Sequence, residues 1–294
     1  MFYRTSACRG LAACLALTST TLAGALPADL GNWSPVVRSK AVKQAAKAGP
    51  EALPQLLEAL DSENTGLRQS ATDVIAAIAR RTPNRQSPEW KTVIARLIEM
   101  LGKDNDFWAR CGAASALKAI ETPVAAPALL LAAGDPNPWV AAAAVDAISH
   151  MPVKFFDRDT YIATAVKSLG APRSATRSSA IKMLHAAGPA SKPVLPKVEA
   201  SIKTLSNDSM FADRPRIDAI QWISKYDKRK AAALANDLML EERWGAKGRY
   251  QKLVPFLQKL GPDAAPAKAG LRRAAGDKRN KPLANMAASI LEKL

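Results

Sequence analysis

The feature that most constrains the fold of this chain is a short pattern that recurs along most of its length. The clearest copy begins Asp-Pro-Asn-Pro-Trp-Val at residues 135–140 and continues into the small residues Ala143, Ala144 and Ala147. A second copy occupies residues 104–117, and a third occupies residues 67–75. Self-similarity at a period of roughly 20–50 residues is typical of solenoids, in which each repeat packs on its neighbours.

One alanine in each copy closes the run of small residues, and the spacing of these anchor alanines measures the repeat. The anchors are Ala41, Ala71, Ala113, Ala144, Ala180, Ala219 and Ala288. They are separated by 30, 42, 31, 36, 39 and 69 residues, and the last interval fits two units with a degenerate copy near Arg249 and Lys252. Each unit has room for two helices of roughly 10–14 residues and two turns.

The local signals agree with helices. Ser34-Pro35 places a capping hydroxyl before a proline at the first helical position. Gly-Pro pairs at 49–50, 188–189 and 261–262 are typical of helix ends, because proline cannot continue a helix. No segment shows the sustained alternation of apolar and polar residues that predicts a strand.

The pattern Asp-Pro-x-x-x-Val-Arg-x-x-Ala-Ala-x-x-Leu resembles a HEAT repeat, in the bacterial form called HEAT-like or phycobilisome-lyase-like. The resemblance covers roughly residues 30–294 and is best at 104–117, whereas Ala141 stands where the family favours Arg and Pro215 where it favours Val. It implies an all-α fold, an α-solenoid superhelix of about seven stacked HEAT-like helix pairs. It also implies that the second helices line a concave surface used to bind partners.

Residues 1–25 have the composition of a secretory signal peptide, and the solenoid is expected to occupy residues 26–294. A basic start precedes an apolar stretch, and Ala23-Gly24-Ala25 suits cleavage near Ala25. A transmembrane anchor is the main alternative, but the stretch is shorter than the ~20 apolar residues that a span needs. A lipoprotein cleavage box at residues 11–14 fits less well, because the apolar run follows Cys14. We therefore expect a periplasmic or secreted protein.

Cleavage near Ala25 would leave Cys111 as the one cysteine, because Cys8 and Cys14 lie in the predicted signal peptide. No internal disulfide is then available, which a chain of this size tolerates because it buries a large core. Cys111 lies beside Arg110 in a run of small residues. We interpret it as a packing residue in preference to a reactive thiol.

The net charge of +16 is concentrated in one half of the chain. Residues 26–160 carry 15 basic and 15 acidic side chains, whereas residues 161–294 carry 25 basic and 11 acidic ones. This asymmetry predicts an anionic partner for the basic C-terminal half: an acidic protein, an anionic polymer or an anionic membrane surface. A solvated basic surface that only favours solubility is the alternative.

Arginines recur at one position of the repeat. They are Arg38, Arg68, Arg110, Arg177, Arg216 and Arg249. If the units stack, these side chains form a row, which we call the arginine ladder. We favour a structural role, with each guanidinium paired to a loop acid such as Asp61 or Asp104 or to turn carbonyls. Direct contact of Arg110, Arg177, Arg216 and Arg249 with a partner is the alternative, because the planar guanidinium binds carboxylate or phosphate equally well.

Two tryptophans occupy equivalent positions in adjacent units. Trp108 and Trp139 each lie five residues before an anchor alanine. They are candidates for rigid aromatic anchors that hold a partner. We slightly favour the other interpretation, in which they cover the seam between the two units.

Catalytic signals are almost absent. The two histidines, His150 and His185, lie in different units, and no ligands at metal-binding spacing appear. The chain has no Gly-rich phosphate loop, no nucleophile elbow and no Cys-x-x-Cys. We expect a protein that is not an enzyme and that binds no cofactor or metal. A chromophore lyase, as in some relatives of these repeats, is least favoured.

The favoured hypothesis is a secreted or periplasmic scaffold that binds another protein of acidic character along the concave face of the solenoid. The alternative is a polyanion-binding protein that holds nucleic acid, lipopolysaccharide or a sulfated glycan through residues 161–294. Binding dominated by phosphate or sulfate groups would weaken steeply with salt, which separates the two hypotheses.

Overall fold

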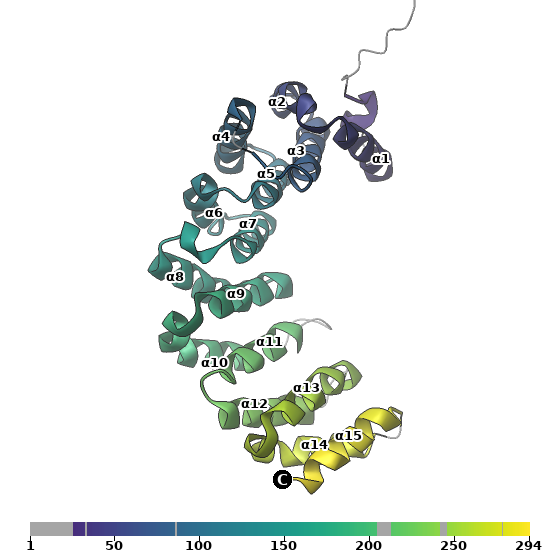
Figure 1. The fold of residues 1–294 in the computed structure, drawn as a ribbon, viewed down its shortest axis with the longest axis vertical. Coiled ribbons are helices and arrows are strands. Elements are labelled where there is room, and N and C mark those ends of the chain that lie inside the picture. Colours follow the sequence, from purple (N-terminus) through teal and green to yellow (C-terminus); the bar gives the residue numbers. More distant parts are fainter. Residues whose placement is uncertain (1–25, 33, 86, 205–212, 242–245, 278) are drawn as a thin grey trace, which may run out of the picture.

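The structure is a computed structural model of the chain, and it describes residues 26–32, 34–85, 87–204, 213–241, 246–277 and 279–294. These residues form α-helices and short 3-10 helices, and no strand occurs among them. The helices stack in chain order into an elongated, curved array (Figure 1). Residues 1–25 lie outside the described residues, so the signal peptide stays a prediction.

Seven helix pairs follow one another, each made of an even-numbered helix and the odd-numbered helix after it. The even-numbered helices are α2 (Leu53–Leu60), α4 (Pro88–Lys103), α6 (Ala126–Ala132), α8 (Arg158–Ser168), α10 (Leu195–Thr204), α12 (Lys228–Leu240) and α14 (Lys268–Ala275). The odd-numbered helices are α3 (Thr65–Ala79), α5 (Phe107–Ile120), α7 (Pro138–His150), α9 (Ser174–Ala187), α11 (Asp213–Ile223), α13 (Ala246–Leu260) and α15 (Lys281–Glu292). The 3-10 helix η1 (Ala28–Gly31) and α1 (Pro35–Ala45) precede them and pack on α3. The predicted all-α solenoid of about seven helix pairs is confirmed.

The two helices of each pair lie in different layers. Successive odd-numbered helices pack on one another from α3 to α15 and form one continuous row. This row lies on the inner side of the curve, and the even-numbered helices lie on the outer side (Figure 1). The second helix of each repeat therefore lines the concave surface, as the resemblance implied.

The anchor alanines explain how closely the inner helices pack. Ala71, Ala113, Ala144 and Ala180 are completely buried. The helices α3 and α5 pack closely at Gly112, because a Cβ added to this glycine would lie 2.2 Å from Oγ1 of Thr72. Small residues at these crossings let helix axes approach to the lower end of the usual 8–10 Å range. In the last unit the prediction is wrong by one residue, since Ala287 is buried and Ala288 is only half-buried.

The Gly-Pro pairs end helices in the way that the sequence predicted. Gly49, Gly188 and Gly261 have φ angles of 75°, 62° and 58°, which lie in the left-handed region that glycine adopts without strain. Each glycine lies in a 3-10 segment that leads into the next even-numbered helix: η2 (Ala46–Ala52), η5 (Gly188–Val194) and η6 (Gly261–Ala267). These three turns therefore share one backbone conformation at their glycine.

Candidate interaction surface

The arginine ladder fastens the turns that precede α1 and several of the inner helices. Four of its arginines donate from Nη1 to the backbone carbonyl six residues earlier. The pairs are Arg38 with Asn32, Arg68 with Ser62, Arg110 with Asp104 and Arg177 with Ala171, at 2.7–2.8 Å. A turn carbonyl has no partner within its own helix, so a guanidinium from the first helical turn satisfies it.

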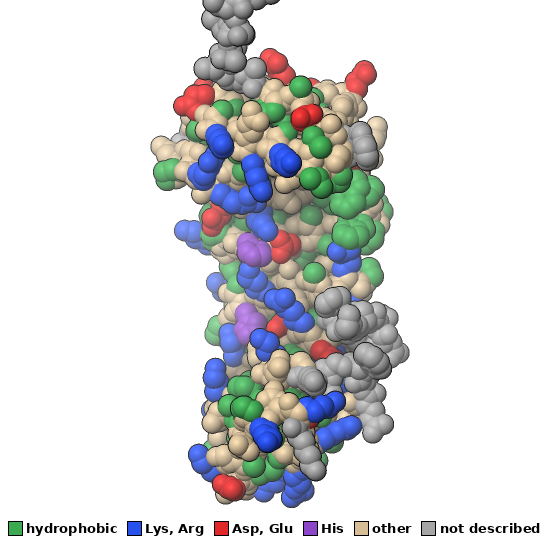
Figure 2. Space-filling view, turned by 90° about the vertical axis from the view of Figure 1, so that its right-hand side faces the viewer, with side chains coloured by type: hydrophobic (Ala, Val, Ile, Leu, Met, Phe, Trp, Pro, Cys, Tyr) green, Lys and Arg blue, Asp and Glu red, His purple; other side chains and the backbone are tan. Residues whose placement is uncertain are grey.

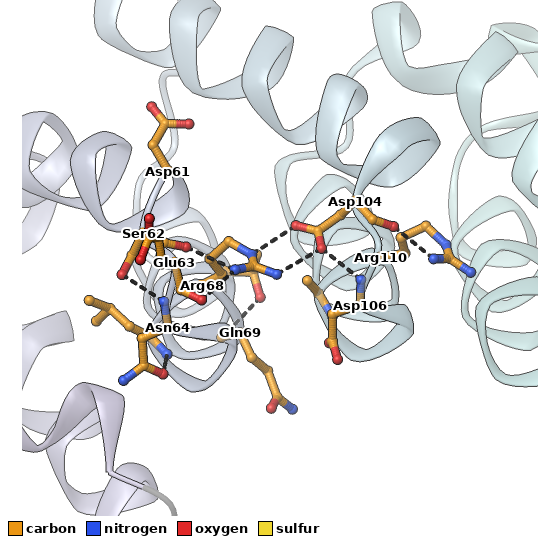
Figure 3. Close-up of polar contacts among 12 residues, drawn as sticks. Asp61, Ser62, Glu63, Asn64, Arg68, Gln69, Asp104, Asp106 and Arg110 are labelled. Carbon is orange, nitrogen blue, oxygen red and sulfur yellow. Dashed lines mark hydrogen bonds and ion pairs between the residues drawn. The ribbon is translucent and has the colours of Figure 1, made fainter.

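The same guanidinium also links neighbouring repeats in the first half of the chain. Nε and Nη2 of Arg68 each donate to a carboxylate oxygen of Asp104 at 2.9 Å, the bidentate geometry that arginine favours. Oδ1 of Asp104 also accepts from the backbone N–H of Asp106 at 2.9 Å. Figure 3 shows this aspartate between Arg68 of its own rung and Arg110 of the next. One side chain thus joins two units and shapes the turn between them.

Arg110 repeats the arrangement one unit further on. Its Nε and Nη2 donate to Asp135 at 3.0 and 3.2 Å, and Oδ1 of Asp135 accepts from the backbone N–H of Asn137 at 2.8 Å. The expected partner Asp104 is therefore confirmed, whereas Asp61 pairs with Arg96 on the outer helix α4 and belongs to no rung.

The ladder is interrupted in the middle of the array. Ala141 takes the ladder position in α7, where it offers no guanidinium to the turn before α9. In that turn, the carbonyl groups of Ala171 and Pro172 accept from Arg177 at 2.7 and 2.9 Å. A different contact occupies this joint, because the guanidinium of Arg173 lies over the ring of Trp139, 3.3 Å from its centroid. A cation–π contact therefore stands where the two preceding joints have an ion pair.

The ladder resumes in the basic half with deeper burial. Arg216 pairs with Glu241, and Nε of Arg249 donates to Asp213 at 2.5 Å. Nη1 of Arg249 also donates to the backbone carbonyl of Glu241 at 3.1 Å. Arg177, Arg216 and Arg249 are only 1%, 4% and 1% exposed. These contacts show a structural role, and burial gives no support to the prediction that these arginines bind a partner.

Trp108 and Trp139 form an exposed aromatic pair at the edge of the array. Each is the second residue of an inner helix, α5 or α7, and each is 44% exposed. Their ring centroids are 5.6 Å apart, and Phe107 adds a third ring 4.7 Å from that of Trp108. The pair therefore spans the seam between two units and still presents almost half of each indole to solvent. Whether it also anchors a partner stays a prediction.

A groove of about 650 Å³ runs along the concave surface between α7, α9 and α11. Its polar lining includes both histidines, His150 and His185, although they are 35 residues apart in the chain. Gln221 at its far side also lines a second groove of about 430 Å³ between α11 and α13, so the two adjoin. Figure 2 views this face, where histidine side chains lie among a column of lysines and arginines with few acids.

Several groups of this groove have an altered proton affinity. Burial lowers the pKa of His185, and the nearby Lys225 lowers it further. Burial raises the pKa of Asp218, against the opposing effect of Arg214 and Lys252. Asp146 lies 2.7 Å from Nζ of Lys118 and 3.5 Å from Nδ1 of His150, so its charge is largely neutralised.

The described residues contain no group of three or more histidine, cysteine, aspartate or glutamate side chains that would hold a metal ion. Cys111 is half-buried, and burial raises the pKa of its thiol to about 11. A thiol with such a pKa stays protonated near pH 7 and is a poor nucleophile, in keeping with a packing role. Within the same residues, no helix has the length and apolar character needed to cross a membrane.

Sequence comparison addresses the repeats themselves. Residues 73–149 match the family model described as HEAT repeats, and they include α5, almost all of α7 and the rung formed by Arg110 and Asp135. A search of the curated proteins finds no match. The finer resemblance to phycobilisome-lyase-like repeats stays a prediction. HEAT repeats generally mediate protein–protein interactions and are usually not catalytic. The match over residues 73–149 and the stacked helix pairs together support a HEAT-repeat α-solenoid.

Proposed function

We propose that the protein is a non-enzymatic scaffold that binds another protein along the concave face of its solenoid. The observation that carries this proposal is the pair of adjoining grooves on α7, α9, α11 and α13, which together form one open path across four inner helices. An open path suits an extended protein segment, whereas a small molecule is usually enclosed over most of its surface.

The aromatic pair extends this surface. Arg173, which stacks on Trp139, is followed directly by Ser174 and Ala175 of the groove lining. Trp108 and Trp139 therefore lie at the mouth of the groove, where inner helices begin. Exposed tryptophans are common energetic centres of protein interfaces. We propose that the partner contacts this pair as well as the groove.

Site-specific photo-cross-linking in the cells that produce the protein tests the concave-face proposal. A photoreactive phenylalanine analogue replaces Ala175 or Gln251, which are exposed groove residues, and in a control replaces the exposed Thr92 of the outer helix α4. We expect discrete cross-linked protein bands from the two groove positions only. Equal bands from all three positions, or bands from Thr92 alone, would refute the concave-face proposal.

We also propose a periplasmic or secreted location, supported by the composition of residues 1–25. Cell fractionation and N-terminal sequencing check it. The expected result is an extracytoplasmic chain whose first residue lies near Leu26. A chain that begins at residue 1 and stays in the cytoplasm would contradict it.

Polyanion binding by residues 161–294 is the second candidate. The excess of 25 basic over 11 acidic side chains in this half favours it. Affinity for a single-stranded oligonucleotide that falls steeply between low and high salt, with no discrete protein partner in the cross-linking experiment, would move the conclusion to this candidate.

A further inference from the structure

Four cations of the adjoining grooves lie outside every ion pair seen among the described residues. Lys182 and Arg214 line the first groove, and Lys252 and Lys259 line the second. All four are exposed, and none makes an ion pair within the part of the chain that the structure describes. By contrast, the buried arginines Arg216 and Arg249 on the same helices α11 and α13 are paired. The unpaired charge therefore gathers on the groove surface.

The acids of the same groove do little to offset these cations. The carboxylate of Asp146 is engaged by Lys118 at 2.7 Å and accepts from Ser179 at 3.4 Å. Asp218 is the other acid among the lining residues, and it stands against the four cations of the two grooves. The groove is consequently an electropositive path.

The start of α9 adds a further attraction for negative charge. The inner helices α3, α5 and α7 each begin with a side-chain cap, from Asn64, Asp106 and Asn137. No side-chain cap bonds to the first turn of α9, whose residues Ser174 and Ala175 line the groove. Uncapped N–H groups at the positive end of a 14-residue helix favour a carboxylate.

The geometry points to an acidic, extended segment of the partner protein as the ligand of this path, and this inference rests on the proposed function. Its carboxylates would pair with Lys182, Arg214, Lys252 and Lys259, and the segment would enter past Trp139. Adjacent inner helices are about 8–10 Å apart. A path across α9, α11 and α13 is then about 20 Å long, which an extended chain covers with about six or seven residues.

The test measures binding of a fluorescent seven-residue peptide of alternating glutamate and serine to the purified chain. A peptide with glutamine in place of glutamate is the control ligand. The double variant Lys182→Gln/Arg214→Gln removes two groove cations. Lys91→Gln/Arg158→Gln, which makes the same charge change at exposed positions of the outer helices α4 and α8, is the matched control.

We expect the glutamate peptide to bind and the glutamine peptide not to bind. The groove variant should weaken binding of the glutamate peptide at least about tenfold, and the control variant less than about twofold. Both variants change the net charge equally, so a difference between them reports the loss of contacts in the groove. Unchanged thermal melting of both variants shows that the fold is intact.

The inference is wrong if the glutamate peptide does not bind, or if both double variants weaken its binding equally. It is also wrong if a charge-matched oligothymidylate binds more tightly than the glutamate peptide and both double variants weaken that binding equally. The last result would favour the polyanion candidate. Cross-links from Ala175 that persist without peptide binding would reject the acidic segment and leave the scaffold proposal standing. Peptide binding without any cross-linked protein would reject the scaffold proposal and leave only the affinity of the groove for an acidic segment.

Discussion

Both halves of the solenoid have an arginine at the same position of the repeat, but its burial and the charges around it differ between the halves. In the first half, Arg68 and Asp104 are equally shielded, with side chains 14% and 10% exposed. In the second half, Arg249 is 1% exposed while its partner Asp213 is 20% exposed. Asp213 and Glu241 there serve both Arg216 and Arg249, in a half with 25 basic and 11 acidic residues. Rungs join two units in both halves, and in the basic half they also neutralise guanidinium groups that are almost completely buried.

The largest expected effect comes from breaking a rung in the basic half. Arg249→Met leaves Asp213 and two turn carbonyls without their donor, and loss of one partner of a buried pair costs about 3–5 kcal/mol of unfolding free energy. Arg68→Met, at a rung that is more exposed, should cost about 1–2 kcal/mol. Urea-induced unfolding followed by circular dichroism measures both. Equal losses in the two variants would contradict the difference between the halves.

Rebuilding the missing rung sharpens the comparison. Ala141→Arg and Ala171→Asp place the two members of a rung where the repeat has lost them. The combined variant should be more stable than the two single changes predict, with a coupling free energy of about 1 kcal/mol. A double-mutant cycle in urea supplies the number. Additive effects would mean that the turn between α8 and α9 holds its aspartate away from position 141.

The cation–π contact at the interrupted joint should be weaker than a rung. Arg173→Gln removes it and should lower the unfolding free energy by about 0.5–1 kcal/mol. Arg173→Lys, which keeps the charge but not the planar group, is the control. Its unfolding free energy should lie between those of the original chain and Arg173→Gln. Urea-induced unfolding followed by circular dichroism measures the change. A loss larger than that of Arg68→Met would reverse the ranking of the joints.

The smallest expected effect concerns Asp218 in the groove. Its pKa in the folded chain is raised above the ordinary value of 3.8, mainly by burial, so the charged carboxylate destabilises the fold at neutral pH. As pH falls through the raised pKa toward 3.8, the folded chain takes up the proton first and this cost disappears. Asp218→Asn should therefore be slightly more stable than the original chain at pH 7 and no more stable near pH 3.8. Urea midpoints at the two pH values, compared between the two chains, test this. A larger gain at the lower pH would refute the assignment.

Much of the fold was predictable because helix pairs leave local signals. The anchor alanines, the Gly-Pro turns and the structural interpretation of the ladder all follow from short-range rules. Asp104, one of the two loop acids named as candidate partners, does pair with a ladder arginine, Arg68. Burial was harder to foresee. Nothing in the sequence around Arg177, Arg216 and Arg249 distinguishes a guanidinium that contacts a partner from one that is buried against a turn, because arginine suits both roles.

The groove was missed, although the repeat contains a signal for it. Asp146, Lys182 and Gln221 each lie two residues after an anchor alanine. His150 and His185 lie six and five residues after theirs. Because these offsets differ by about one helical turn, they share one face of each inner helix. Reading them as a column across the repeats would have brought the two histidines together.

The absent rung at Ala141 has a mechanical consequence. Along the solenoid, a guanidinium that holds the turn of the next unit acts as a brace against bending, and the joint between α7 and α9 has a stacked ring in its place. Ring stacking tolerates sliding, whereas a bidentate ion pair fixes both distance and angle. We therefore expect this joint, where the groove and the tryptophan pair meet, to be more compliant than the two joints before it, so that the span of this surface could adjust to a bound segment.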